Sequence, residues 1–334
     1  MVRIVFSDPR PGEEVIPLAV ACGISRDDRP MFDRLRREGP ALWRAADWSQ
    51  ADLAVYANRY DDLPAAHDFA GRAAAAGLPC LFFDTSDCHD IYRPPHGVVY
   101  RSAVYADRLT PSDRAMPAPC DDMLADAGGR LALREKSDRP SVGFCGYVSP
   151  WYRQLLRAVR GEAEKIRGHR VRRSAIAALR HSRRVETCFD VRPDFWGGAL
   201  AANWDPVTLR RARSRFAANV LGSDYTLCAR GAGNFSTRFY EALSAGRIPL
   251  LIDTRCVLPF ADRIDWRRHC LIVAEGDIAR AGDLLAQFHA GLTPEQFREL
   301  QTDNRRLWEE WLEPLSAHRR VVADALTGAA QSAV

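Results

Sequence analysis

The residues best suited to bind a charged ligand lie in one short stretch, RGAGNFSTR, from Arg230 to Arg238. A loop of small residues leads there into an expected helix, and the unpaired backbone N–H groups of a helix start favour anions. Both arginines can make fork-like contacts with phosphate oxygens. A cation in the first helical turn is unfavourable by itself, so the position of Arg238 suggests that an anion binds beside it. The stretch therefore predicts a diphosphate site.

The side chains of this stretch have separate roles in the prediction. Ser236 and Thr237 are good N-cap types whose hydroxyls can also donate to phosphate. Glu241, one turn after Arg238, is placed to accept hydrogen bonds from a ribose diol. The candidate ligand-binding residues are Arg230, Gly231, Gly233, Asn234, Ser236, Thr237, Arg238 and Glu241. The alternative is a plain ion pair between Arg238 and Glu241 at positions i and i+3 of the helix.

Short apolar runs that alternate with helical stretches must position this site. A strand at 225–229, a helix at 236–245 and a strand at 248–252 have the βαβ rhythm of a parallel sheet. Further strands are expected at 2–6, 51–56, 80–83, 98–100, 141–147 and 270–273, and further helices at 65–76, 153–167 and 294–326, the last interrupted at Pro314.

The proline-rich stretch from 110 to 140 interrupts this rhythm and predicts a crossing between two domains. The expected fold is α/β, with two Rossmann-like, doubly wound domains facing across a cleft. The predicted domains are residues 1–130, residues 131–315 with the diphosphate site, and a C-terminal helix and tail at 316–334.

Short elements around the site follow one another in an order that resembles the signature of the exostosin family of glycosyltransferases. They are Ala229-Arg230-Gly231, Ser236-Thr237-Arg238, Glu241-Ala242-Leu243, Gly246-Arg247-Ile248-Pro249, Leu258-Pro259-Phe260 and Ile264-Asp265-Trp266. The likeness is specific from about Leu227 to Trp266, and weaker upstream at 51–56 and 141–146. Ala229 departs from the pattern, because family members often carry proline there.

The resemblance implies a GT-B fold and transfer of a sugar, usually with inversion, from a nucleotide-sugar donor, with a UDP-sugar expected. The second domain would hold the donor, with Arg230, Ser236 and Arg238 at the diphosphate and Glu241 at the ribose. The acceptor, on the first domain, would be a hydroxyl of a glycan, a lipid-linked molecule or a small molecule. No Asp-x-Asp pair occurs in the chain, so neither a metal nor another cofactor is expected.

Three roles are compatible with this reading. Assembly of a surface polysaccharide or glycoconjugate is the expected one. The alternatives are tailoring of a small natural product, and a catalytically silent module of the same fold that only binds a nucleotide or sugar.

An inverting transfer needs a general base for the proton of the acceptor hydroxyl. The candidates are polar residues that follow strands of the first domain: Asp87 is the first choice, and Asp8 and His89 are next. Asp84 lies in the same loop region, and Arg101 is a further residue that could face the cleft. Each carboxylate could equally be a loop residue that bonds to nearby backbone.

Charge and cysteine usage limit the partners and the compartment. The arginine-rich segment 167–184 fits a solvated amphipathic helix, or else contact with an anionic acceptor or a membrane surface. No nucleic acid is expected, because neither a recognisable nucleic-acid fold nor stacking aromatics accompany the segment. The nine cysteines include no C-x-x-C pair, and neither a signal peptide nor an apolar run of about 18 residues is evident. We expect a cytoplasmic protein, with the inner membrane surface as one location.

Overall fold

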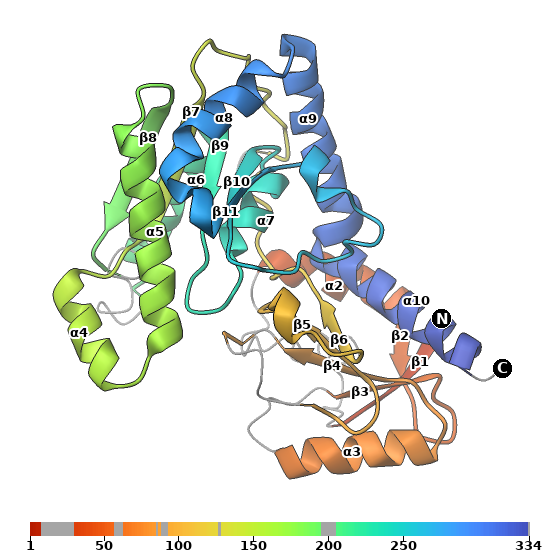
Figure 1. Cartoon of the computed structure of the whole chain (residues 1–334). Helices are drawn as coiled ribbons and strands as arrows, with labels where there is room; N and C mark the ends of the chain where they lie inside the picture. Colours follow the sequence, from red (N-terminus) through yellow and green to blue (C-terminus); the bar gives the residue numbers. More distant parts are fainter. Residues whose placement is uncertain are drawn as a thin grey trace. The chain divides into compact units, whose positions relative to one another are not determined.

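The computed structural model describes residues 1–7, 30–56, 63–84, 86–87, 93–125, 128–194 and 205–332, which form two compact units (Figure 1). The first unit consists of Met1–Asp121, Cys256–Phe260 and Glu310–Val334, and the second of Asp122–Arg255 and Ala261–Glu309. The sequence places the boundaries after residues 130 and 315. In the structure the chain enters the second unit at Asp122 and returns to the first at Glu310.

The first unit is built on six parallel strands in the order β2-β1-β3-β4-β5-β6. The strands are β1 Val2–Phe6, β2 Trp43–Ala45, β3 Leu53–Tyr56, β4 Cys80–Asp84, β5 Val98–Arg101 and β6 Asp113–Ala115. The helical elements are η1 Pro30–Phe32, α2 Asp33–Glu38, η2 Gly39–Ala41, α3 Leu63–Ala75, η3 Ala106–Arg108 and α10 Pro314–Ser332.

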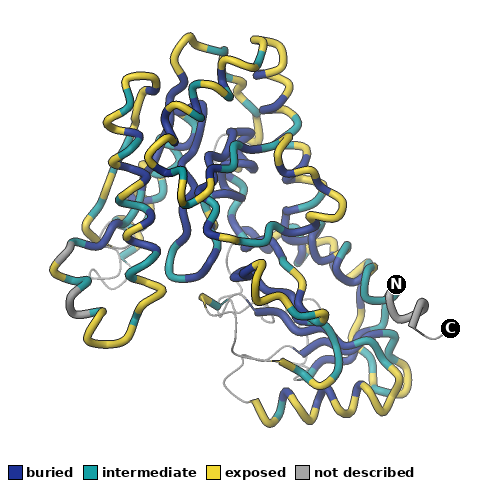
Figure 2. Tube along the Cα trace, in the orientation of Figure 1, coloured by how far each residue is buried: buried dark blue, intermediate teal, exposed yellow. Residues whose placement is uncertain are grey.

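Helices cover both faces of this sheet, because successive residues of each strand point to opposite faces. Ile4 and Phe6 share an apolar cluster with Leu315 of α10. Val5, between them, belongs instead to a cluster with Phe69 of α3. Strands that are buried on both faces are typically apolar throughout. The strands β3 and β4 are buried along their whole length (Figure 2).

The second unit is built on five parallel strands in the order β11-β10-β9-β7-β8. The strands are β7 Ser141–Tyr147, β8 Glu186–Arg192, β9 Tyr225–Cys228, β10 Ile248–Asp253 and β11 Leu271–Ala274. The helical elements are α4 Trp151–Val159, α5 Ala163–His181, α6 Pro206–Leu221, α7 Thr237–Ser244, η6 Trp266–Arg268, η7 Glu275–Arg280, α8 Ala281–Ala290, α9 Pro294–Leu307 and the π-helical turn η8 Trp308–Leu312.

Both sheets have the same strand order when strands are counted along the chain: second, first, third, fourth, fifth, with β6 added in the first unit. Phe144 of β7 lies in one cluster with Val171 of α5. Its neighbour Gly143 lies against α6, where a Cβ would come within 2.9 Å of Asn219 Oδ1. Helices therefore flank the second sheet on both faces too. The prediction of two Rossmann-like, doubly wound α/β domains, the composition of a GT-B fold, is confirmed.

Several elements escape the sequence patterns. β2 and β6 have three residues each, and β6 lies inside the stretch predicted to be an irregular crossing. β8 is largely polar and α6 has no clear apolar stripe, so neither was predicted. The helix expected at 153–167 is wrong as one element. Gly161, with a φ of 69°, separates α4 from α5, because this left-handed conformation suits glycine and ends a helix.

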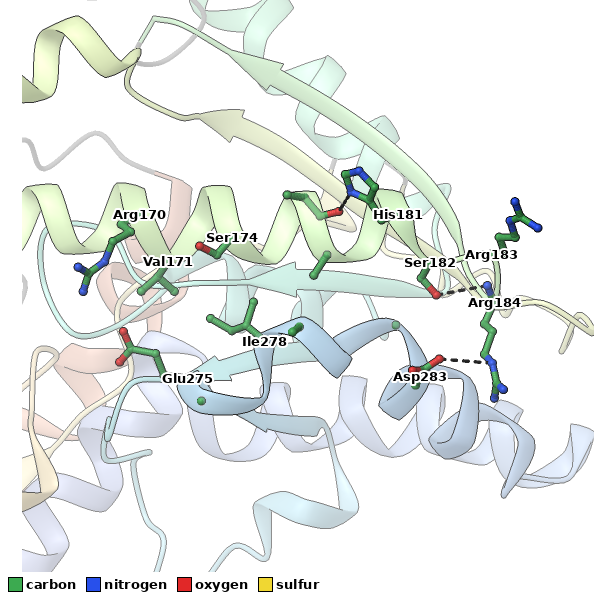
Figure 3. Close-up of a pocket in the computed structure, with 15 residues that line it drawn as sticks. Arg170, Val171, Ser174, His181, Ser182, Arg183, Arg184, Glu275, Ile278 and Asp283 are labelled. Carbon is green, nitrogen blue, oxygen red and sulfur yellow. Dashed lines mark hydrogen bonds and ion pairs between the residues drawn. The ribbon is translucent and has the colours of Figure 1, made fainter.

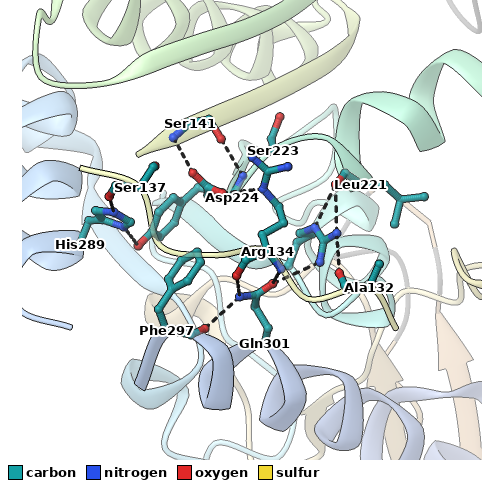
Figure 4. A network of polar contacts seen from close by, with 12 residues as sticks. Ala132, Arg134, Ser137, Ser141, Leu221, Ser223, Asp224, His289, Phe297 and Gln301 are labelled. Carbon is teal, nitrogen blue, oxygen red and sulfur yellow. Dashed lines mark hydrogen bonds and ion pairs between the residues drawn. The ribbon is translucent and has the colours of Figure 1, made fainter. Parts of the chain in front are cut away.

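A polar network attaches the crossing segment to the second unit (Figure 4). Arg134 Nε lies 2.5 Å from Asp224 Oδ1, and Gln301 of α9 makes two hydrogen bonds of 2.9 Å with the backbone of Arg134. Arg247 donates to the same Gln301 side chain, and burial lowers the pKa of Arg247 to about 10. Arg247 of the Gly-Arg-Ile-Pro motif is therefore a structural residue. The second unit begins before residue 131 because Asp122 lies 2.5 Å from Arg305 of α9 and the backbone N–H of Met123 donates to Ser244 Oγ of α7 at 3.2 Å.

Candidate functional site

The eight predicted ligand-binding residues follow β9, the central strand of the second sheet. The chain leaves β9 after Cys228, turns through 229–236 and enters α7 at Thr237. β9 adjoins β7, the first strand of this sheet, and the strand order reverses between these two. Doubly wound sheets bind ligands outside the carboxyl ends of their strands at such a switch point.

Arg238 is the second residue of α7 and is only half-buried. Its guanidinium carbon lies 4.5 Å from the ring centroid of Phe144 and 5.7 Å from that of Phe216. Nη2 donates a hydrogen bond of 2.8 Å to the carbonyl of Cys145, whereas Nε is buried and has no hydrogen-bond partner in the described segments. Within the described part of the chain, Arg238 makes no ion pair. A buried N–H without a partner is rare in folded proteins, so Nε points to a ligand or to ordered water.

Glu241 pairs with a different arginine. Its carboxylate is buried, with 9% of the residue exposed, and lies 2.8 Å from Arg213 Nη1 on α6. The alternative of a plain ion pair between Arg238 and Glu241 is therefore wrong. The helix spacing permits that pair, but the neighbouring helix supplies a closer cation.

Arg230 is engaged by its own loop. It is 2% exposed, and Nη2 lies 2.7 Å from a carboxylate oxygen of Glu164 on α5 and donates to the carbonyl of Ala232 at 2.6 Å. These contacts hold the turn in shape. A direct contact between Arg230 and a diphosphate would require them to be exchanged.

The rest of the turn packs closely against its surroundings. Gly168 of α5 has no side chain where a Cβ would lie 1.9 Å from the carbonyl oxygen of Gly231. Asn234 is buried and accepts a hydrogen bond of 2.5 Å from the hydroxyl of Thr254. Ser236 is the N-cap of α7, as predicted, but its side chain makes no capping hydrogen bond. Thr237 is exposed and Gly233 is buried.

Sequence reasoning missed the residues that support the turn from other elements. Arg172 of α5 donates to the carbonyls of Tyr147, at 3.1 Å, and Ala229, at 3.4 Å, and so joins the carboxyl ends of β7 and β9. From α6, Arg213 contacts Glu241 and Phe216 contacts Arg238. Arg172 was visible only as part of an arginine-rich segment, and nothing in the sequence singles out Arg213.

A buried histidine lies near the carboxyl end of β7. His169 of α5 accepts a hydrogen bond of 3.1 Å at Nδ1 from the backbone N–H of Ser149. Burial, together with the positive charges of Arg172, Arg157 and Arg173, lowers the pKa of His169 to about 3. His169 is therefore neutral at physiological pH.

This histidine makes the fold sensitive to acid. The folded-state pKa of His169 is lower than its ordinary value, so the unfolded chain binds a proton first as the pH falls below about 6.5. The free energy of unfolding should then fall by about 1 kcal/mol between pH 6.5 and 5.5 because of this residue. His169→Gln should reduce the pH slope measured by chemical denaturation, and the exposed His181→Gln should not. Equal slopes for all three proteins would contradict the assignment.

The candidates for the general base differ in how far the structure describes and exposes them. Asp87 is exposed, and Asp8 and His89 lie outside the described residues. Asp84 is fully buried, with Oδ2 2.5 Å from Arg101 Nη1, and Arg101 Nε lies 2.8 Å from Asp113. Asp84 and Arg101 thus belong to a buried ion cluster at the ends of β4 and β5, and neither side chain is exposed.

A hollow of about 800 Å³ lies elsewhere in the second unit, between α5 and the segment η7–α8 (Figure 3). Val171 and Ser174 of α5 and Ile278 of η7 are in its wall, and an ion pair of 3.3 Å joins Arg184 to Asp283 beside it. None of the eight predicted residues lines it. The candidate site is therefore identified by the chemistry of the β9–α7 turn and not by the size of a cavity.

Other kinds of site are not evident in the described residues. No helix among them is both long and apolar enough to cross a membrane. The same residues contain no group of three His, Cys, Asp or Glu side chains placed to hold a metal ion.

Comparison with known proteins points to one family. Residues 144–288 match the model of the Exostosin GT47 domain. The Exostosin-1 homolog of Caenorhabditis elegans is 30% identical over 93 residues, which is 28% of this chain and 23% of that protein. A probable glucuronosyltransferase of Oryza sativa subsp. japonica is 42% identical over 62 residues, which is 19% of this chain and 15% of that protein. The match thus spans less than a quarter of either relative.

Solved structures add a distant likeness. HepE of Anabaena in complex with UDP aligns with 98% of this chain and 99% of its own, at 10% identity and a TM-score of 0.46. A likeness at this level does not establish a shared fold, so the fold described above stands on the strand order and the helix packing.

Proposed function

The chain belongs to the exostosin family through its domain at residues 144–288, and on that premise we propose that it is a glycosyltransferase that binds a nucleotide-sugar donor at the β9–α7 turn. One observation carries the proposal: Arg238, at the start of α7, has a buried N–H that finds no partner among the described residues. A diphosphate carries at least two negative charges. Its oxygens would accept hydrogen bonds from this N–H and from the backbone N–H groups of the first helical turn.

The neighbouring residues complete the donor site in this proposal. Ser236 and Thr237 donate to the diphosphate oxygens, and the small residues of the loop let the backbone approach it closely. Glu241 accepts from the ribose diol, and Arg230, engaged with Glu164, keeps the loop in shape. Because the residues present bear positive charge and N–H groups, they can stabilise the leaving diphosphate without a metal ion.

The proposed reaction is one in-line displacement. The oxygen of an acceptor hydroxyl forms a bond to the anomeric carbon, and the bond from that carbon to the diphosphate oxygen breaks, with inversion. The electron pair leaves with the diphosphate, where Arg238 stabilises it. The hydroxyl proton goes to a general base, for which Asp87, Asp8 and His89 stay predictions.

We extend the proposal to the biological role in coarse terms. A UDP-sugar is the proposed donor, and a glycan, a lipid-linked molecule or a small molecule supplies the acceptor hydroxyl. A cytoplasmic enzyme that builds a surface polysaccharide is the proposed setting, and tailoring of a natural product is the second candidate.

The test begins with ligand binding. Thermal unfolding is recorded with UDP, GDP and dTDP, because a ligand that binds only the folded protein stabilises it, by about 2.7 kcal/mol at 100 times its Kd. A rise in Tm with UDP that persists in a chelator is expected. No shift with any of the three would contradict the proposal. Release of UDP from a UDP-sugar when acceptors are added separates a transferase from a silent binding module.

Contact with a membrane surface is part of the proposal. Arg160, Arg170 and Arg183 are exposed and make no ion pair with the described residues, and on α4 Tyr152 is 50% and Val159 is 89% exposed. Basic and apolar side chains that are both exposed in this part of the chain suit an anionic lipid surface. The chain should sediment with vesicles that contain phosphatidylserine but not with pure phosphatidylcholine. Changing the three arginines to glutamine should abolish this binding, and unchanged binding would count against the contact.

A further inference from the structure

Helix α6 contacts both of the side chains assigned to the donor. Arg213 Nη1 lies 2.8 Å from Glu241 Oε1, and the ring centroid of Phe216 lies 5.7 Å from the guanidinium carbon of Arg238. We propose that Arg213 and Phe216 are positioning residues: Arg213 holds Glu241 for the ribose diol, and Phe216 holds Arg238 for the diphosphate. This inference rests on the proposed function.

Arg213 restricts the carboxylate of Glu241. A carboxylate only accepts hydrogen bonds and has room for several, so Glu241 can accept from Arg213 and from a ribose at once. The Glu241 side chain is only 11% exposed and the Arg213 side chain 21%, so few water molecules compete for this ion pair. Held in this way, the carboxylate keeps one orientation for the 2′- and 3′-hydroxyls. A 2′-deoxyribose lacks one of the two donors, so the site should select ribonucleotides.

Phe216 restricts the guanidinium of Arg238. Together with Phe144, at 4.5 Å, it provides a second aromatic ring near the cation. Such cation–π contacts are directional enough to limit how the guanidinium turns. The ring centroid of Phe216 also lies 5.7 Å from the guanidinium carbon of Arg213, but the ion pair between Arg213 and Glu241 does not depend on the ring. The main effect of Phe216 should therefore fall on the diphosphate.

The helix that carries both residues is capped at its N-terminus and attached to the sheet near its C-terminus. The side chain of Asp205 caps its N-terminus by accepting from the backbone N–H of Thr208 at 2.8 Å. Near its C-terminus, Asn219 Nδ2 donates to the carbonyl of Cys188 in β8 at 2.6 Å. A helix fixed to the sheet in this way can hold side chains in constant positions, as a preorganised binding site requires.

The two roles predict different signatures in one binding experiment. Calorimetric Kd values for UDP and 2′-deoxy-UDP are compared for the wild type, Arg213→Met, Phe216→Leu, Glu241→Gln and the control Arg211→Met. Arg211 lies on the same helix, is exposed and makes no ion pair with any residue that the structure describes. The wild type should bind UDP about tenfold more tightly than 2′-deoxy-UDP, because the deoxy analogue cannot make one charge-assisted hydrogen bond to Glu241.

In Arg213→Met and in Glu241→Gln this ratio should fall to near one. In Phe216→Leu both nucleotides should bind more weakly by the same factor, roughly fivefold, with the ratio unchanged. Arg211→Met should match the wild type. Arg213→Lys, which keeps the cation, should restore part of the ratio, and it replaces Arg213→Met if that variant does not fold.

Distinct results would overturn the inference. If Arg213→Met keeps the wild-type ratio while Glu241→Gln loses it, Arg213 does not act through Glu241. Equal binding of UDP and 2′-deoxy-UDP by the wild type would exclude ribose recognition. If GDP is the tighter ligand, the same comparison uses GDP and 2′-deoxy-GDP. A wild-type chain that binds no nucleoside diphosphate at all contradicts the proposed function itself.

Discussion

Arg238→Ala should abolish the thermal stabilisation by a nucleoside diphosphate while the fold survives. Charge-assisted hydrogen bonds contribute roughly 1.5–3 kcal/mol each, so losing the guanidinium should weaken binding on the order of 100-fold. The unliganded fold should change little, because the side chain is half-buried and makes one hydrogen bond, to the carbonyl of Cys145. Calorimetric Kd values and the Tm without ligand measure the two effects.

Two further variants make the Arg238 result specific. Arg211→Ala removes an exposed arginine of the same unit that forms no ion pair within the described part of the chain, and it should leave nucleotide binding unchanged. Arg238→Lys keeps the charge but loses the planar fork, so its affinity should lie between those of the wild type and Arg238→Ala. If Arg238→Ala binds as tightly as Arg211→Ala, the diphosphate is not bound at the β9–α7 turn.

Arg101→Met should produce the largest loss of stability, and it acts in the first unit. It would leave Asp84 and Asp113, which are 0% and 4% exposed, without the cation between them. Burial alone would raise the pKa of Asp113, but hydrogen bonds from Arg101 and Thr110 outweigh it and hold that pKa below its ordinary value. Removing one partner of a buried ion cluster costs about 3–5 kcal/mol. Scanning calorimetry of the full chain should show a lower unfolding temperature.

A matched surface pair provides the control. Arg3 and Asp52 are 2.5 Å apart, with side chains that are 39% and 34% exposed. Arg3→Met removes the same side chain from the same sheet, but water can solvate the remaining carboxylate, so the loss should be much smaller than for Arg101→Met. If both variants lose the same stability, the buried cluster is not what stabilises this part of the sheet.

The β9–α7 turn could be predicted because its parts are contiguous. A strand, a loop of small residues and a helix start follow one another between Tyr225 and Glu241, and each is recognisable from local pattern. Ser236 is the N-cap and Arg238 is in the first turn, as expected. The general base could not be predicted with the same method. Its candidates are scattered loop residues, and Asp84 shows that such a residue can equally be part of a buried ion pair.

By itself, the sequence determined the parallel βαβ units and the strand, loop and helix start that form the β9–α7 turn, because apolar periodicity, small-residue loops and cap residues act over short distances along the chain. Only the tertiary structure decided that Glu241 pairs with Arg213 and not with Arg238, and that Arg230 is engaged by its own loop and Glu164. The tertiary structure also brings Phe144 and Phe216 into contact with the guanidinium of Arg238. The physical reason is that an ionic or aromatic partner is chosen by distance in space. Packing, and not local spacing, brings segments such as α6 and α7 within that distance.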